Sequence, residues 1–167
     1  MIDPRFTALT EIDRRLTAAG FLPLPPWWLD QAERFYASNA RTWVARVGRG
    51  GVKSGALVRL ALAETLAGPF VVPAGERHAF AFISISKDEA GQRLAQIEAA
   101  LRALGVGYSR AGEVFDLDDL PRGFRVLSCT VAATSGFRCI GAALDELAKW
   151  RRDESGVNVD REVIASI

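Results

Sequence analysis

One stretch constrains the fold more than any other: an apolar run that leads into glycines, a Lys-Ser pair and a long helical segment. Residues 43–47 form an apolar, β-branched run, which predicts a buried strand. Gly48, Gly50 and Gly51 follow directly. Lys53 and Ser54 then open a segment, 54–67, with the pattern of a helix. A strand, a glycine-rich turn, Lys-Ser and a helix, in this order, are the context of a phosphate-binding loop.

The residue types of this loop suit an anion. Glycines let backbone N–H groups surround a phosphate, and the helix N-terminus adds a partial positive charge. Lys53 is expected to reach the β- and γ-phosphates of a nucleotide, and the Ser54 hydroxyl to ligate Mg²⁺. The match to the pattern G-x-x-x-x-G-K-[ST] is incomplete, because Val47 and Val52 stand at its two glycine positions. A glycine-rich turn with a solvated lysine is the alternative.

Composition is that of a globular domain. The chain has 167 residues, of which 49% are hydrophobic and 25% charged, so one domain with a real core is expected. A net charge of +1 gives no field that would by itself attract nucleic acid or membrane. No apolar run could span a bilayer and no secretory signal is visible, so a cytoplasmic location is expected. Cys129 and Cys139 are predicted to be free thiols.

Two helices are predicted before the loop. Asp3 caps a helix that ends at Gly20, an extended connector covers residues 21–26, and a second helix covers 28–38. Residues 1–41 form an N-terminal helical segment, and residues 42–167 form the core. Gln31, on the second helix, is a candidate to bind the adenine edge through paired hydrogen bonds. An exposed helical glutamine is the alternative.

The core alternates strands and helices, which predicts an α/β fold with a parallel sheet. Residues 79–85 form an apolar strand, and Ser86 begins a capping box for a helix that Gly105 ends. Residues 106–117 are expected to form a hairpin with its turn at 109–112. Another strand covers 124–131, and the carboxylates of residues 116, 118 and 119 are assigned to a solvated turn.

A second informative stretch ends in two carboxylates. The strand over residues 139–144 is followed by Asp145 and Glu146, which would lie at the carboxyl edge of the sheet, where α/β proteins bind ligands. Asp145 is predicted to hold Mg²⁺ opposite Ser54, and Glu146 to polarise the water that attacks the γ-phosphate. An ordinary strand end before an acidic helix N-terminus is the alternative.

These stretches, Gly48-Arg-Gly-Gly-Val-Lys-Ser54 followed by Ala143-Leu-Asp-Glu146, resemble the ATPase domain of tailed-phage terminase large subunits. Segments 84–90 and 136–138 are also similar, and the resemblance covers roughly Trp27 to the end. It implies a P-loop NTPase-type, mostly parallel sheet flanked by helices, with ATP and Mg²⁺ as cofactors. It further implies that Arg49 senses or stabilises the γ-phosphate, with Arg46 and Arg138 as weaker candidates.

The resemblance also implies a biological role. In that family, ATP hydrolysis drives double-stranded DNA into a bacteriophage procapsid in the host cytoplasm. The motor is a homo-oligomeric ring that works with the portal protein and the terminase small subunit. Here the chain ends soon after Glu146, so the ATPase core is expected to be truncated after its acidic strand, without a nuclease domain. The alternatives are a catalytically inactive nucleotide-binding or assembly remnant, or another P-loop enzyme, helicase-like or kinase-like.

Overall fold

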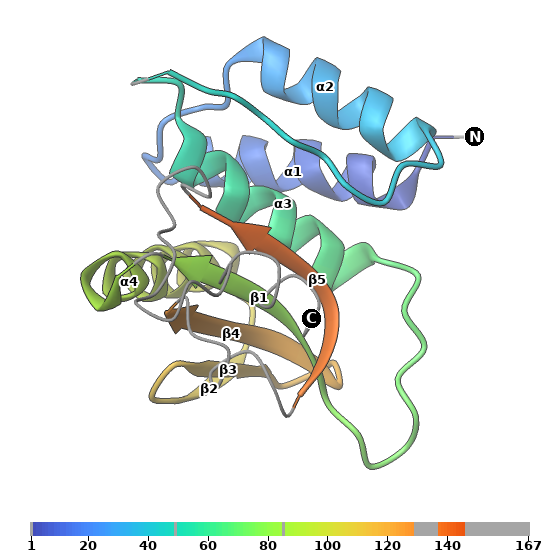
Figure 1. The fold of residues 1–167 in the computed structure, drawn as a ribbon, viewed down its shortest axis with the longest axis vertical. Helices are drawn as coiled ribbons and strands as arrows, with labels where there is room; N and C mark the ends of the chain where they lie inside the picture. The colour runs from blue at the N-terminus through green and yellow to red at the C-terminus, as the bar shows by residue number, and fades with distance from the viewer. Residues whose placement is uncertain (1, 49, 85, 129–136, 146–167) are drawn as a thin grey trace, which may run out of the picture.

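The computed structural model describes residues 2–48, 50–84, 86–128 and 137–145. Its elements, in chain order (Figure 1), are α1 (Pro4–Ala18), α2 (Pro26–Ala37), α3 (Lys53–Ala67), β1 (His78–Ser84), α4 (Lys87–Leu104), β2 (Tyr108–Ala111), β3 (Val114–Leu117), β4 (Arg122–Ser128) and β5 (Arg138–Leu144). The predicted α/β class is therefore confirmed.

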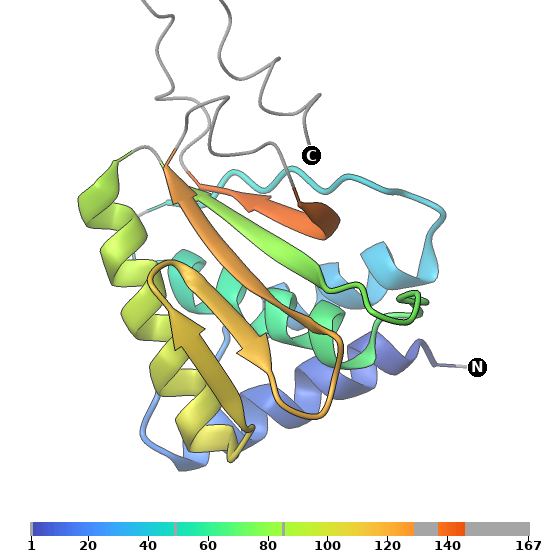
Figure 2. The ribbon, with the colours of Figure 1, turned by 90° about the horizontal axis from the view of Figure 1, so that it is seen from below.

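The five strands form one mixed sheet in the order β2-β3-β4-β1-β5. β1 pairs in parallel with β4 on one side and with β5 on the other, and Figure 2 shows these strands side by side. The hairpin β2–β3 adds two antiparallel strands at the β4 side. The expected sheet was mostly parallel, whereas the described sheet is parallel only over β4, β1 and β5.

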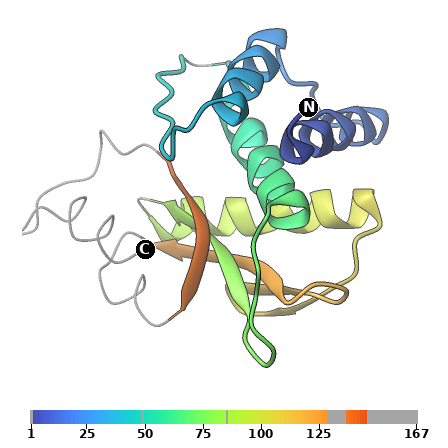
Figure 3. The same ribbon diagram turned by 90° about the vertical axis from the view of Figure 1, so that its right-hand side faces the viewer.

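The helices gather on one face of the sheet in two layers (Figure 3). α3 and α4 pack on the strands, and α1 packs on α3 and α4 on the side away from the sheet. Because α3 lies between the sheet and α1, it is buried almost all round, through residues such as Ala56, Ala61, Leu62 and Ala63. A single core cluster joins α1, α2, α3, α4 and the inner face of the sheet.

Local capping explains where the helices begin and end. The Asp3 side chain accepts a hydrogen bond from the Arg5 backbone N–H at 2.8 Å, and Pro4 follows at the first helical position. The Ser86 hydroxyl accepts from the Glu89 N–H at 3.2 Å, as the capping-box pattern predicts. Gly105 ends α4 in the left-handed conformation. These boundaries are confirmed to within about two residues.

The strand predicted over residues 43–47 is wrong. Residues 42–48 have no regular secondary structure and run back along α2 (Figure 1), with Val44 84% exposed. The Trp43 ring instead packs against Trp28 and Phe35 of α2, with ring centroids 5.4 Å and 5.7 Å away. The aromatic face of α2 thus provides the apolar contact that the pattern suggested a sheet would provide.

The predicted hairpin turn is also displaced. Residues 109–111 belong to β2, and the reversal occurs at Gly112 and Glu113. Gly112 has φ +59°, which suits a tight two-residue hairpin loop better than the expected turn at 109–112. The predicted strand 124–131 is described as far as Ser128, and its last residues, with Cys129, lie outside the described parts of the chain.

A buried ion pair fixes the connector between α1 and α2 against α3. Arg59 is 2% exposed, and its Nε lies 2.8 Å from Oδ1 of Asp13. Its Nη2 donates to the Leu22 carbonyl at 2.8 Å, and Asp13 accepts from the Leu24 N–H at 3.1 Å. Burial lowers the pKa of Arg59, and Asp13 opposes that effect.

None of the helices in the described parts of the chain has the length and apolar character that crossing a bilayer requires.

Candidate functional site

The predicted phosphate-binding loop is a tight, irregular turn that leads directly into α3. Gly50 has φ +81°, in the region that glycine adopts without a Cβ clash. A Cβ on Gly51 would lie 2.4 Å from Cγ1 of Val47, so a larger residue here would have to displace the Val47 side chain. Val52 is the helix N-cap residue with φ 53° and ψ 27°, and its side chain makes no capping hydrogen bond. The first turn of α3 thus begins without a side-chain acceptor at its N-cap.

A tryptophan side chain of α2 is hydrogen-bonded to the loop backbone. Nε1 of Trp28 donates to the Gly51 carbonyl at 2.8 Å, and Trp28 itself is 2% exposed. Its ring stacks on Trp27 with centroids 4.4 Å apart and meets Trp43 edge-on. The loop backbone is therefore fixed by a buried aromatic side chain rather than by a preceding strand.

The structure brings together Lys53, Ser54 and Asp145, three of the residues predicted from the two separate motifs. Asp145 directly follows β5, and its N–H donates to the Ile83 carbonyl at 3.1 Å, which extends the β1–β5 pairing. Nζ of Lys53 lies 3.0 Å from Oδ1 of Asp145. The Ser54 hydroxyl and the other carboxylate oxygen of Asp145 are joined through a fourth residue, Arg93 of α4.

Arg93 was not predicted as a site residue, yet it is central. Its Nη2 donates to Oγ of Ser54 at 2.7 Å and to Oδ2 of Asp145 in a short hydrogen bond. Its Nη1 donates to Oε1 of Gln96 at 2.5 Å. The sequence does contain a signal for it: Arg93 stands between Ala90 and Ile97 in the apolar stripe of α4, so its charge had to be buried or paired.

The Asp145 carboxylate is ionised and strongly held. Burial raises the pKa of Asp145, but hydrogen bonds from Arg93 and Lys53 lower it by more than burial raises it. The pKa therefore lies below its ordinary value. The side chain of Asp145 is 8% exposed, whereas that of Lys53 is 33% exposed. The carboxylate is thus fixed inside the protein, and the lysine lies at its solvent side.

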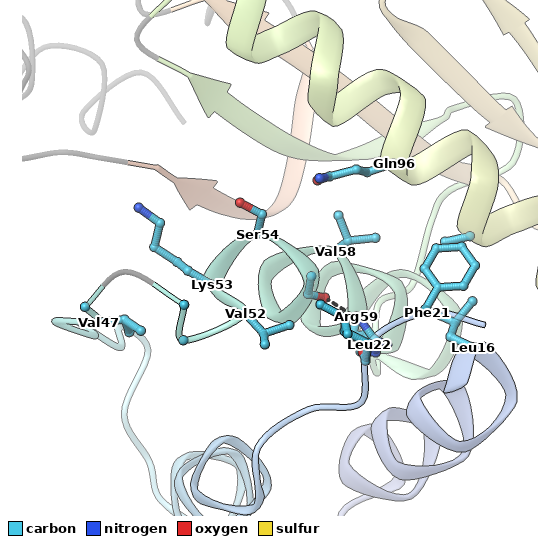
Figure 4. A pocket seen from close by; sticks show the side chains of 15 residues that line it. Leu16, Phe21, Leu22, Val47, Val52, Lys53, Ser54, Val58, Arg59 and Gln96 are labelled. Carbon is cyan, nitrogen blue, oxygen red and sulfur yellow. Dashed lines mark hydrogen bonds between the residues drawn. The ribbon is translucent and has the colours of Figure 1, made fainter. Parts of the chain in front are cut away.

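A cavity of about 660 Å³ adjoins this group, a size typical of small-ligand pockets. Figure 4 shows the loop at one end and the side chains of Phe21, Leu22 and Leu16 at the other, with Ser54 and Gln96 along one side. The loop, α1, the connector, α3 and α4 all contribute to its lining, which is Leu16, Phe21, Leu22, Val47, Gly48, Gly50, Gly51, Val52, Lys53, Ser54, Gly55, Val58, Arg59, Gln96 and Ala100.

Several predicted residues lie elsewhere. Gln31 is on α2, where its amide donates to Asp30 at 2.9 Å, and it does not line the cavity. Arg46 is exposed in the irregular segment 42–48. Arg138, at the start of β5, pairs with Glu76 at 2.9 Å. Arg49 and Glu146 lie outside the described residues.

The donor set at Ser54 and Asp145 fits Mg²⁺. A hydroxyl and a carboxylate are hard oxygen ligands, and Mg²⁺ beside phosphates uses few protein ligands, with water and phosphate oxygens as the rest. Within the described residues no three His, Cys, Asp or Glu side chains gather closely enough to hold a metal by themselves. A metal here would therefore depend on a bound phosphate for part of its coordination.

Comparison with known proteins gives the residues no outside support. No family model, curated protein or solved structure matches this chain.

Proposed function

We propose that this chain is a P-loop-type nucleoside triphosphatase domain that binds ATP with Mg²⁺. One observation carries the proposal: Lys53 and Ser54, from the glycine-rich loop, meet Asp145, from the end of β5. These residues are far apart in the sequence, and their convergence is the arrangement that two independent motifs predicted. The parallel strands β4, β1 and β5, with α3 and α4 on one face, support the P-loop class.

Each residue has a role that its chemistry permits. The N-terminus of α3 and the backbone of the loop would bind the β- and γ-phosphates, and Lys53 would add a full positive charge. Ser54 and Asp145 would hold Mg²⁺, which neutralises charge on the phosphates when bound. From the sequence resemblance, Glu146 would polarise the attacking water, and Arg49 would stabilise charge on the γ-phosphate.

The cavity supports a nucleotide rather than a bare phosphate as the ligand. It extends from the loop toward Phe21 and Leu22, whose apolar side chains suit the face of a base. Gln96, on the wall of the cavity, supplies an amide that could hydrogen-bond a base or sugar edge. A phosphate at the loop and a base near Phe21 would fill the two ends.

The wider role follows from the sequence resemblance alone. We assign the chain to the ATPase portion of a terminase-like DNA-packaging motor, acting on double-stranded DNA in a homo-oligomeric ring with a portal protein and a small subunit. The two motifs that carry the resemblance are the two whose side chains converge here. Comparing ATP turnover with and without double-stranded DNA tests this assignment.

A second candidate is a nucleotide-binding module without turnover. Two observations favour it: Val52 holds a left-handed conformation in the loop, and segment 42–48 does not form the strand that leads into such loops. Both would weaken the positioning of the γ-phosphate without preventing binding. Nucleotide affinity without hydrolysis, unchanged by Glu146→Gln, would identify this module.

The experiment is titration of the chain with a fluorescent ATP analogue in Mg²⁺, together with measured phosphate release. We expect Lys53→Ala to weaken binding about tenfold or more, because it removes a charge-assisted contact to phosphate. The matched control is Arg34→Ala, which removes one positive charge from the exposed side of α2. Equal binding by wild type and Lys53→Ala, or no binding by either, would refute the proposal.

A further inference from the structure

One nitrogen atom of Arg93 contacts the side chains of both residues that the proposed function assigns to Mg²⁺. Nη2 donates to Oγ of Ser54 at 2.7 Å and to Oδ2 of Asp145. The nitrogen donates one hydrogen bond to each of the two side chains, so the guanidinium lies between them. A cationic group thus occupies the position between the two predicted metal ligands.

Arg93 is buried there and only partly satisfied. The residue is 7% exposed, and the side chain of Asp145 is 8% exposed. Nη1 donates to Gln96, but Nε has no hydrogen-bond partner among the described residues. A buried N–H without a partner is costly, so this position of the guanidinium leaves one of its donors unsatisfied.

Guanidinium and metal ion are alternatives at these two oxygens. Mg²⁺ requires close, nearly octahedral contact with its oxygen ligands, and a second cation between the same oxygens would be repelled at that range. Lys53 does not face this conflict, because it lies on Oδ1, the other oxygen of Asp145. Arg93, by contrast, is a cation that touches both Ser54 and Asp145.

We propose that Arg93 is a positioning residue that holds the metal's place: it orders Ser54 and Asp145 when no metal is bound, and it must leave them before the metal can bind. This inference rests on the proposed function of the site. It adds a regulation to that site, because metal binding is opposed until the guanidinium moves.

The test is titration of the full chain with Mn²⁺ alone, followed by the electron paramagnetic resonance signal of free Mn²⁺. We expect Arg93→Gln to bind Mn²⁺ about tenfold more tightly than wild type, because a charge-assisted competitor is removed. The added affinity should disappear in Arg93→Gln combined with Asp145→Asn. Arg102→Gln, on the same helix but with its side chain 70% exposed, is the matched control and should equal wild type.

A second measurement uses the wild-type side chain and so does not depend on a variant that folds. The Nε–Hε nuclear magnetic resonance signal of Arg93, assigned by its loss in Arg93→Lys, should shift with Mg²⁺ and ATP together. It should shift less with ATP in the presence of a chelator.

The outcomes separate the two proposals. The place-holding role is overturned if Mn²⁺ affinity is equal in wild type and a folded Arg93→Gln and the Arg93 signal does not respond to Mg²⁺. If ATP still binds in that case, the proposed function stands. If wild type binds no nucleotide in the fluorescence titration, the proposed function fails and this inference fails with it.

Discussion

Val52 is the one described residue other than glycine with a positive φ, and it stands at the start of the helix that carries Lys53 and Ser54. The left-handed conformation costs an L-residue about 1–2 kcal/mol, and a β-branched side chain suffers most. Its side chain contacts the core cluster, which offsets part of that cost. The pattern G-x-x-x-x-G-K-[ST] has glycine at this position, and the left-handed backbone explains why, because glycine adopts that conformation readily.

We expect Val52→Gly to raise the free energy of unfolding, because the backbone strain worth about 1 kcal/mol is relieved. The gain is reduced by the stabilisation that packing of the valine side chain contributes. Val52→Ala should lower it, because alanine keeps the strained backbone and loses the packing. Urea unfolding of the three proteins measures the difference. An alanine variant at least as stable as the glycine variant would show that φ at this position is not the source of strain.

The site could be predicted only in part at this scale. Lys53, Ser54 and Asp145 could be named as candidates from the sequence because each stands in a recognisable local motif. Arg93 was missed because its role depends on where α4 lies relative to β5, which no local pattern contains. Trp28 was missed for a similar reason, since its bond to Gly51 joins an N-terminal helix to a loop far along the chain.

At the scale of elements, helices were predicted well and one strand was not. Capping residues such as Asp3, Ser86 and Gly105 form their hydrogen bonds with residues a few positions away in the sequence. Their effect can therefore be predicted from the local sequence alone. A strand, in contrast, exists only if a partner strand pairs with it. Residues 43–47 have the composition of a strand, but Trp43 packs on the aromatic side chains of α2 instead.

The junction of three helices gives a prediction with a pH dependence. Glu64 of α3 lies 3.4 Å from Nη1 of Arg5 on α1, and Tyr36 of α2 is also close enough to affect its pKa. Burial raises the pKa of Glu64, and contacts with Arg5 and Tyr36 offset only part of this effect. Because the folded pKa is above the unfolded one, this carboxyl favours folding at low pH, and the contribution is lost as pH rises through the folded pKa.

We therefore expect Glu64→Gln to become more stable relative to wild type as pH rises from 4.5 toward neutrality. Urea unfolding at several pH values measures this trend. Glu11→Gln is the control, because a hydrogen bond from Arg14 lowers the pKa of Glu11, so its pH dependence has the opposite sign and lies mainly below about pH 4.5. A difference between Glu64→Gln and wild type that is the same at all pH values would contradict the expectation.

At the scale of the whole molecule, β5 is one of the two end strands of the described sheet, and β2 is the other. β5 pairs with β1 on one side, and no described strand pairs with its other side. An unpaired strand edge is a template for pairing with another chain. The position matters because Asp145, at the end of β5, belongs to the candidate site.

We expect the purified chain to self-associate reversibly as its concentration rises. Sedimentation equilibrium under reducing conditions measures this, and the reductant ensures that the free thiol of Cys139 does not link the copies. A monodisperse monomer at high concentration would show that the β5 edge is protected.

The indole of Trp28 gives this loop its own optical reporter. Trp27, Trp28 and Trp43, three of the four tryptophans of the chain, lie in ring contact, and one of them is bonded to the loop backbone. Any ligand that shifts Gly51 must change the surroundings of these coupled rings. The emission and near-ultraviolet circular dichroism of the unlabelled protein therefore follow the state of the loop directly.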